Sequence, residues 1–243
     1  CFIATFLSIT GVTVLSFFVV KREERGEFVQ GAYRSSAAIL GIAFIQNIYG
    51  TSGMAPLMII GTVPLYNAFA VIVLSLLKPG QRKMDKALLQ KTLKGIVTNP
   101  IILGIAAGFV WAILKIPQPE ILQKTVKNMA VLATPLGLMA MGASFEGKKA
   151  LGKLKPTLIA SALKLVVLAA IFLPMAVRLG YRESELVAIL VMLGSATTVS
   201  SFVMARNMGH EGVLTSSIVM VTTLCSAFTL TGWLFLLKTL GLV

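Results

Sequence analysis

Residues 186–209 read LVAILVMLGSATTVSSFVMARNMG, an apolar segment whose centre is a run of small and hydroxyl-bearing residues. The segment is long enough for a helix that crosses roughly 30 Å of hydrocarbon. Gly194 and the run from Ser195 to Ser201 favour local unwinding, which would free backbone N–H groups to hold a polar ligand at the middle of the membrane. The alternative is that these small residues only allow helices to pack closely.

The rest of the chain has the same apolar character. Of its 243 residues, 56% are hydrophobic and 13% are charged, against about 45–50% and about 25% in ordinary soluble domains. The apolar residues form blocks of about 17–25 separated by polar joints, which predicts an all-α polytopic membrane protein. We expect eight membrane helices, over residues 1–20, 27–50, 54–77, 99–115, 126–145, 156–178, 184–207 and 213–237.

The net charge of +13 indicates membrane topology rather than nucleic-acid binding, because the basic residues lie in the joints and not on one polar face. Taken together, the joints after the first, third, fifth and seventh predicted helices hold 15 Lys and Arg, against 5 in the joints between them. The positive-inside rule makes these joints cytoplasmic, so we expect a protein of the cell membrane with its C-terminus on the outer face. Residues 78–98 are expected to be a cytoplasmic linker, either a surface amphipathic helix or a solvated segment.

The predicted helices carry little catalytic chemistry. All acidic residues and the single histidine lie in or beside joints, so no carboxylate pair, metal cluster or catalytic triad can be assembled within the membrane. We therefore expect no enzyme and no cofactor. Two cations, Arg34 and Lys164, lie about eight residues inside predicted helices, where a charge is costly and usually functional unless it snorkels to the interface. Asn47 and Asn67 are expected to form interhelical hydrogen bonds.

Two pairs of similar tetrapeptides indicate an internal repeat. The tetrapeptides YRSS at 33–36 and YRES at 181–184 open two predicted helices, and GTSG at 50–53 and GHEG at 209–212 close them. Because the basic joints put the two openings on opposite faces, the repeat would be inverted, as in many secondary transporters. Five predicted helices follow the long joint and three precede it, so we expect that two N-terminal helices are absent.

Several motifs together resemble the auxin efflux carrier family, which includes bacterial malate and malonate permeases. They are GSATTVSSFVMARNMG at 194–209, VTTLCS at 221–226, GAYRSS at 31–36, NP at 99–100, TPLG at 134–137 and GASF at 142–145. The resemblance covers the whole chain. It implies a ten-helix fold of two inverted five-helix repeats, a substrate held where two broken helices cross, and a dimer formed through a separate scaffold.

Mapped onto this pattern, residues 1–77 form a truncated first repeat, 78–98 the linker, 99–145 the scaffold helices and 146–243 the second repeat. Ala43 and Ala196 stand where the family usually has its crossover prolines, and Ser36 stands where asparagine is usual. The helix breaks are therefore expected to depend on Gly41, Gly194 and the hydroxyl run, near residues 36–41 and 195–198.

The leading hypothesis is a secondary transporter that moves a small organic anion, a carboxylate, by alternating access. The alternatives are a sodium-coupled symporter of the related bile-acid type, and a membrane enzyme or non-transporting sensor. Expected partners are the organic anion, the lipid bilayer and a second copy of the chain, without nucleic acid or metal. The predicted substrate-binding residues are Arg34, Ser36, Gly41, Lys164, Ser195, Thr197, Thr198, Ser200 and Ser201.

Overall fold

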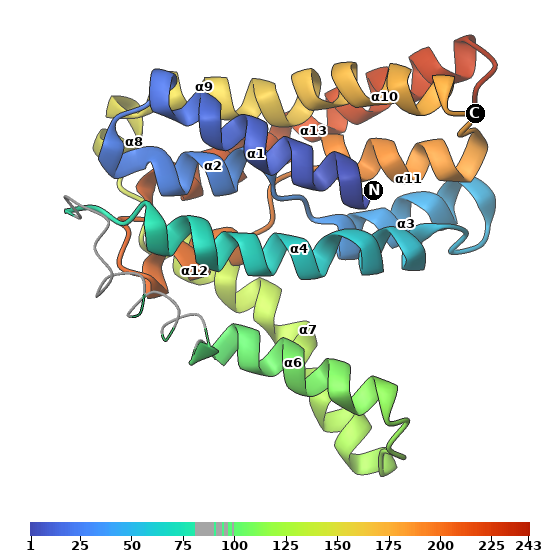
Figure 1. The fold of residues 1–243 in the computed structure, drawn as a ribbon, viewed down its shortest axis with the longest axis horizontal. Coiled ribbons are helices and arrows are strands. Elements are labelled where there is room, and N and C mark those ends of the chain that lie inside the picture. Colours follow the sequence, from blue (N-terminus) through green and yellow to red (C-terminus); the bar gives the residue numbers. More distant parts are fainter. Residues whose placement is uncertain (81–89, 91–93, 95–96, 99) are drawn as a thin grey trace.

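The computed structural model describes residues 1–80, 90, 94, 97–98 and 100–243 (Figure 1). Most of the linker predicted at 78–98 therefore lies outside the described residues. The described part of the chain consists of helices and short connections, without a strand. The all-α class predicted from the apolar blocks is confirmed.

Five of the predicted membrane helices are continuous helices that are long and apolar enough to cross a membrane. Each begins and ends within about six residues of its predicted bounds. They are α1 (Phe2–Val19), α4 (Ala55–Leu76), α7 (Glu120–Ala143), α13 (Val213–Thr239), and the run Leu154–Arg178 made of α9 (Leu154–Ala162), a π-helical turn η2 (Leu163–Val167) and α10 (Leu168–Arg178).

Two of the other predicted helices are interrupted. The first consists of α2 (Arg25–Tyr33) and α3 (Ala37–Tyr49), and the second of α11 (Glu183–Gly194) and α12 (Ser200–Asn207). The first break spans 34–36, so the expectation that it extends to Gly41 was wrong. Gly41 lies inside α3, where the Met58 side chain packs so closely that a Cβ at Gly41 would come within 2.5 Å of its Cε.

The remaining predicted helix, over 99–115, is shorter than expected. The observed α6 (Pro100–Ile113) has 14 residues, and a helix of this length covers about 21 Å, less than the hydrocarbon thickness. Short helices η1 (Arg22–Glu24) and α8 (Gly147–Gly152) precede α2 and α9.

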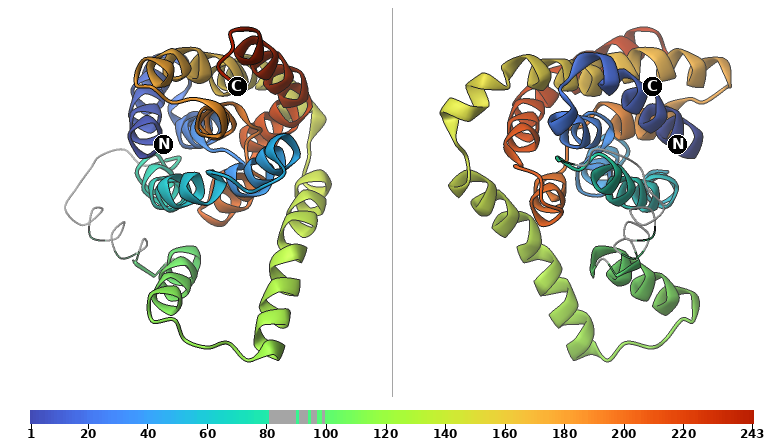
Figure 2. Two further views of the ribbon diagram at one scale, coloured as in Figure 1. Left: turned by 90° about the vertical axis from the view of Figure 1, so that its right-hand side faces the viewer. Right: turned by 60° about the vertical axis from the view of Figure 1, so that its left-hand side comes forward.

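The helices form a bundle with an arm. Figure 1 shows α1 to α4 and α8 to α13 side by side, while α6 and α7 extend away from them. In Figure 2, left, α11 runs through the middle of the bundle. Every described residue of α11 from Leu186 to Gly194 is buried, as is every residue of α2 from Gly26 to Tyr33. The two half-helices that precede the breaks thus form the core.

The arm contacts the bundle near one end of α7. The only buried residues of α7 are Gly137 and Met141. Val199 and Val203 of the second broken segment fill the space beside Gly137. The remaining surface of α7 exposes large apolar side chains, including Ile121, Val131 and Met139. Such a surface is stable against lipid or another apolar partner and not in water.

Candidate functional site

The two breaks lie against each other. The Ser36 N–H donates to the Ala196 carbonyl at 2.9 Å, and the Thr197 hydroxyl donates to the Gly31 carbonyl at 2.7 Å. These bonds satisfy backbone groups that lose their helical partners at a break, which would otherwise be costly in hydrocarbon. Each break therefore depends on the other for its hydrogen bonds, without a proline in either.

Neighbouring helices fix the breaks from outside. The Thr197 N–H donates to the Thr222 hydroxyl of α13 at 3.1 Å. From α4, the Tyr66 hydroxyl donates to the Met192 carbonyl of α11 at 3.2 Å. The Ser35 hydroxyl, in the first break, donates to the same carbonyl. The unwound segments are thus held in one geometry, which is what a binding site needs.

Lys164 lies on the side of the breaks where α2 and α11 end. Its side chain is 0% exposed, and its ammonium donates to the carbonyls of Leu193 at 2.7 Å and Tyr33 at 3.3 Å. It also donates to the Ser35 hydroxyl and to the Met192 carbonyl. Because the C-terminal ends of helices carry partial negative charge, one cation between two such ends stabilises both. The π-helical turn around Lys164 is of the kind often found at functional sites.

A cavity opens on the other side of the breaks. Its volume is about 370 Å³, and its walls come from both breaks, from α4, from α12 and from α7. The polar side chains in these walls are Arg34, Ser35, Ser36, Tyr66, Asn67, Thr134, Thr198 and Ser200. The contribution of α7 places the cavity between the bundle and the arm.

Among the lining residues that the structure describes, Arg34 is the only one with a charged side chain. It is 4% exposed; its guanidinium donates to Asn67 Oδ1 and contacts Met204 Sδ. Asn67 is itself oriented by a bond from its Nδ2 to the Val63 carbonyl at 3.0 Å. Among the residues that the structure describes, no Asp or Glu pairs with Arg34. A buried cation with only neutral partners favours an incoming anion.

Two helix N-termini adjoin the same cavity. Helix α3 begins at Ala37 and α12 at Ser200, and neither has a side-chain cap. The first N–H groups of a helix have no partner within it and carry partial positive charge, which attracts anions. Ser36, Ala38 and Ser200 line the cavity, so these helix ends add neutral donors to the charge of Arg34.

The predicted site residues divide into two groups. The cavity wall contains Arg34, Ser36, Thr198 and Ser200. The other predicted residues lie outside it: Lys164, Thr197, Gly41, Ser195 and Ser201. Lys164 and Thr197 hold the breaks together, Gly41 packs within α3, and the Ser195 and Ser201 hydroxyls are buried without a protein partner.

Sequence reasoning missed several residues at this site. Asn67 was expected only to join helices, and it orients Arg34 as well as lining the cavity; Asn47 is exposed on α3. Tyr66 and Thr134 were not singled out. They are two of many scattered polar residues, and no sequence pattern indicated that α4 and α7 would meet the breaks.

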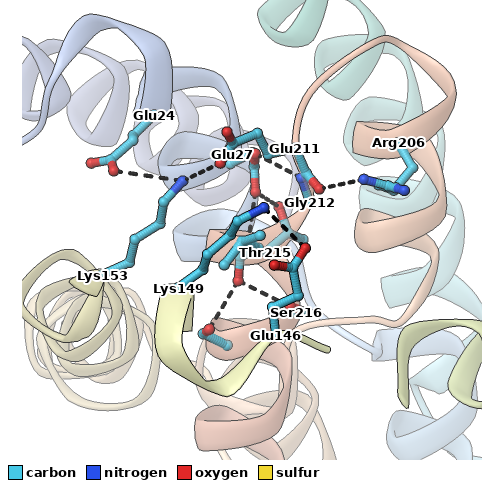
Figure 3. A network of polar contacts seen from close by, with 12 residues as sticks. Glu24, Glu27, Glu146, Lys149, Lys153, Arg206, Glu211, Gly212, Thr215 and Ser216 are labelled. Atoms are coloured by element: carbon cyan, nitrogen blue, oxygen red, sulfur yellow. Dashed lines mark hydrogen bonds and ion pairs between the residues drawn. The ribbon is translucent and has the colours of Figure 1, made fainter. Parts of the chain in front are cut away.

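Glu27 was also missed, because its position beside a joint suggested a solvated carboxylate. It is 2% exposed and accepts hydrogen bonds from the N–H groups of Gly212 at 2.9 Å and Thr215 at 2.8 Å (Figure 3). The Thr215 hydroxyl donates to it as well. Since α13 begins after a glycine that offers no side-chain cap, Glu27 of α2 caps this helix from across the bundle.

An ionic network surrounds this cap at the same end of the bundle (Figure 3). Lys153 pairs with Glu211 at 2.8 Å and with Glu24 at 3.7 Å. Burial alone would lower the pKa of Lys153, but the hydrogen bond with Glu211 and the charges of Glu211, Glu27 and Glu24 outweigh it and raise that pKa. The hydrogen bond from Lys153 in turn lowers the pKa of Glu211. The network ties η1, the junction between α8 and α9, and the loop before α13 together.

Comparison with known proteins agrees with the apolar helices. The family described as membrane transport protein matches residues 1–234. The chain belongs to this family. The match fits the resemblance to auxin efflux carriers, whose members are transporters rather than enzymes. No curated protein matches the sequence. The chain is therefore a multi-pass membrane protein that serves transport.

Among the described residues, no group of three His, Cys, Asp or Glu side chains could hold a metal ion. Arg34 and the helix ends remain the groups suited to bind a ligand, and they suit an anion.

Proposed function

We propose that this transporter moves a small organic anion whose carboxylate binds in the cavity beside Arg34. The observation that carries the proposal is the burial of this guanidinium, at 4% exposure, against a cavity and without an acidic partner among the described residues. Asn67 and Met204 use only part of its five donors. The rest suit the bidentate binding of a carboxylate.

The neutral donors of the site support the same ligand. The Thr198 and Ser200 hydroxyls lie 3.2 Å apart at the N-terminus of α12, where the partial positive charge of the helix end favours an anion. A ligand with two acidic groups would bind Arg34 with one and the helix N-terminus with the other. The cavity of about 370 Å³ is near the lower limit for ligand pockets, about 300–1,000 Å³, and therefore favours a small solute.

The packing of the helices supports alternating access through an inverted repeat. Helix α1 packs against α2 as α10 packs against α11, and α4 packs against α3 as α13 packs against α12. In addition, α4 contacts α11 and α13 contacts α2. We infer that these two sets of helices form a transport unit that moves relative to the arm and opens the cavity to each side in turn.

The exposed apolar surface of α6 and α7 supports a homodimer in the cell membrane. In the proposed orientation the end of the bundle with Lys153 and Glu211 is cytoplasmic, and the C-terminus lies on the outer face, at the same end of the bundle as the N-terminus (Figure 1). The arm would then pack against the arm of a second copy within the plane of the bilayer. The cavity would lie on the side of the bundle nearest this contact.

Transport of a labelled dicarboxylate into proteoliposomes tests the function. We expect Arg34→Gln to weaken the apparent affinity by about 10- to 100-fold, the loss that follows when a charged hydrogen-bonding partner is removed. Arg34→Lys should restore part of it, since the charge remains but the planar fork does not. Lys21→Gln is the matched control, because it removes an exposed basic residue from the joint that precedes this broken helix and should leave affinity unchanged.

Three measurements decide the outcome. Cysteine labelling from each side must show the same orientation for all variants, because removing a cytoplasmic charge can invert a helix. Uptake with and without a sodium gradient separates an anion carrier from a sodium-coupled symporter. Wild-type affinity in a correctly oriented Arg34→Gln protein would refute carboxylate binding by Arg34, and the absence of uptake by the wild type would refute the proposed substrate class.

A further inference from the structure

A second hollow lies at the basic end of the bundle, away from the cavity beside Arg34. It is a groove of about 440 Å³ between Phe145, α8, the start of α9 and α13. Its apolar lining residues are Phe145, Ala150, Leu151, Leu154, Met220, Val221 and Leu224. Leu151 and Leu224 are 66% and 71% exposed, so the groove is open to its surroundings.

The two hydroxyl residues in the groove do not make it polar. The Thr157 hydroxyl donates to the Lys153 carbonyl at 2.7 Å, and the Ser217 hydroxyl donates to the Val213 carbonyl at 2.9 Å. Both therefore offer mainly hydrocarbon to the groove. From Ser217 to Leu224 the groove follows α13 for seven residues, or roughly 10 Å at 1.5 Å per residue. Such a surface suits an alkyl chain.

The helices that form the groove also carry three lysines, which lie outside its lining. Lys148 and Lys149 lie on α8 beside the groove residue Ala150, and Lys155 follows the groove residue Leu154; all three lysines are exposed. Lys149 pairs with Glu146 at 3.0 Å (Figure 3), an exposed pair of the kind that contributes little and can exchange partners. In the described part of the chain, neither Lys148 nor Lys155 forms an ion pair.

An apolar groove on helices that also carry three exposed lysines suits an anionic phospholipid. We propose that such a lipid binds here, with an acyl chain between α8, α9 and α13 and its phosphate on Lys148, Lys149 and Lys155. Basic residues at the start of membrane helices attract anionic lipids at the cytoplasmic surface. The site does not depend on the identity of the transported solute, because it shares no lining residue with the cavity beside Arg34.

The position of the groove links the lipid to the broken segment. Val221 and Leu224 line the groove, and Thr222 between them accepts the hydrogen bond from the Thr197 N–H in the second break. A lipid that packs on this part of α13 therefore supports the segment that fixes the break from outside.

Native mass spectrometry of the purified full chain tests the proposal, with phosphatidylglycerol and phosphatidylcholine of identical acyl chains as probes. We expect the wild type to retain phosphatidylglycerol at least tenfold better than phosphatidylcholine. Lys148→Gln combined with Lys155→Gln should weaken this binding by roughly 30-fold, in line with about 1 kcal/mol for each basic residue at an anionic surface. Ala150→Trp should abolish it by filling the groove.

Matched controls are available elsewhere on the chain. Lys124→Gln with Lys127→Gln removes two lysines from the predicted joint at the other side of the membrane, and Ala170→Trp adds an indole to an exposed position of α10. Both should retain the lipid. If the lysine substitutions abolish phosphatidylglycerol binding but Ala150→Trp does not, the lipid is attracted by surface charge alone and does not occupy the groove. That result would overturn the site. Equal retention of the two lipids, or cross-linking of a second protein copy to Ala150→Cys in place of a lipid, would overturn the proposal as well.

Discussion

Replacing Glu27 by glutamine tests how the start of α13 is stabilised. The carboxylate accepts from two backbone N–H groups, those of Gly212 and Thr215, and from the Thr215 hydroxyl. Glutamine keeps one acceptor oxygen but turns an N–H donor toward groups that are themselves donors. Because glutamine is neutral, the substitution also removes the favourable interaction between a negative charge and the helix N-terminus.

The expected cost follows from these contacts. A hydrogen bond to a charged group contributes about 1.5–3 kcal/mol, and a charge at a partly buried helix end adds up to about 2 kcal/mol. Because glutamine retains one acceptor, we expect Glu27→Gln to lower the free energy of unfolding by about 3 kcal/mol. For a chain of this size that corresponds to a decrease in Tm of about 6–12 °C.

Thermal unfolding in detergent, followed by tryptophan fluorescence, measures this change. Trp233 lies on α13 itself and donates to the Leu165 carbonyl at 3.1 Å, so its emission reports the docking of this helix. Glu23→Gln is the matched control, because Glu23 is an exposed acid of the preceding turn and should shift Tm by less than about 2 °C. Equal Tm values for Glu27→Gln and the wild type would refute the capping role.

Three further predictions concern other contacts. Lys164→Met should lower the free energy of unfolding by about 2–4 kcal/mol, because it leaves buried carbonyls without a donor, and it should abolish transport. A urea unfolding curve identical to that of the wild type would contradict this stabilising role. Thr198→Val should weaken transport of the anion several-fold without changing Tm, because Thr198 lines the cavity; unaltered uptake would exclude it from the site. The lowered pKa of Glu211, ordinarily 4.5, means that its pairing with Lys153 stabilises the protein above about pH 4.5 and is lost as the pH falls through the lower folded value. Wild-type Tm should therefore decrease more steeply below pH 4.5 than that of Glu211→Gln, and parallel curves would argue against this linkage.

The sequence by itself determined the membrane class, five continuous helices and the presence of two interruptions. These properties are local: the length of an apolar block decides whether a helix can cross the bilayer, and a run of glycine and hydroxyl residues weakens a helix where it stands. The exact position of the first break was not predictable, because Gly41 is helical in the packing environment that Met58 provides. The unwound residues 34–36 are instead stabilised by groups of the second break and by Lys164.

Only the tertiary structure decided which polar groups meet. Lys164 was identifiable as a buried cation, but its role depends on carbonyls at the ends of two other helices, one of them more than a hundred residues away. Glu27 resembled a solvated acid until the start of α13, 185 residues further along the chain, was placed against it. In hydrocarbon, each polar group must find a partner within the protein, and the partner is chosen by how the helices pack and not by the pattern of any one segment.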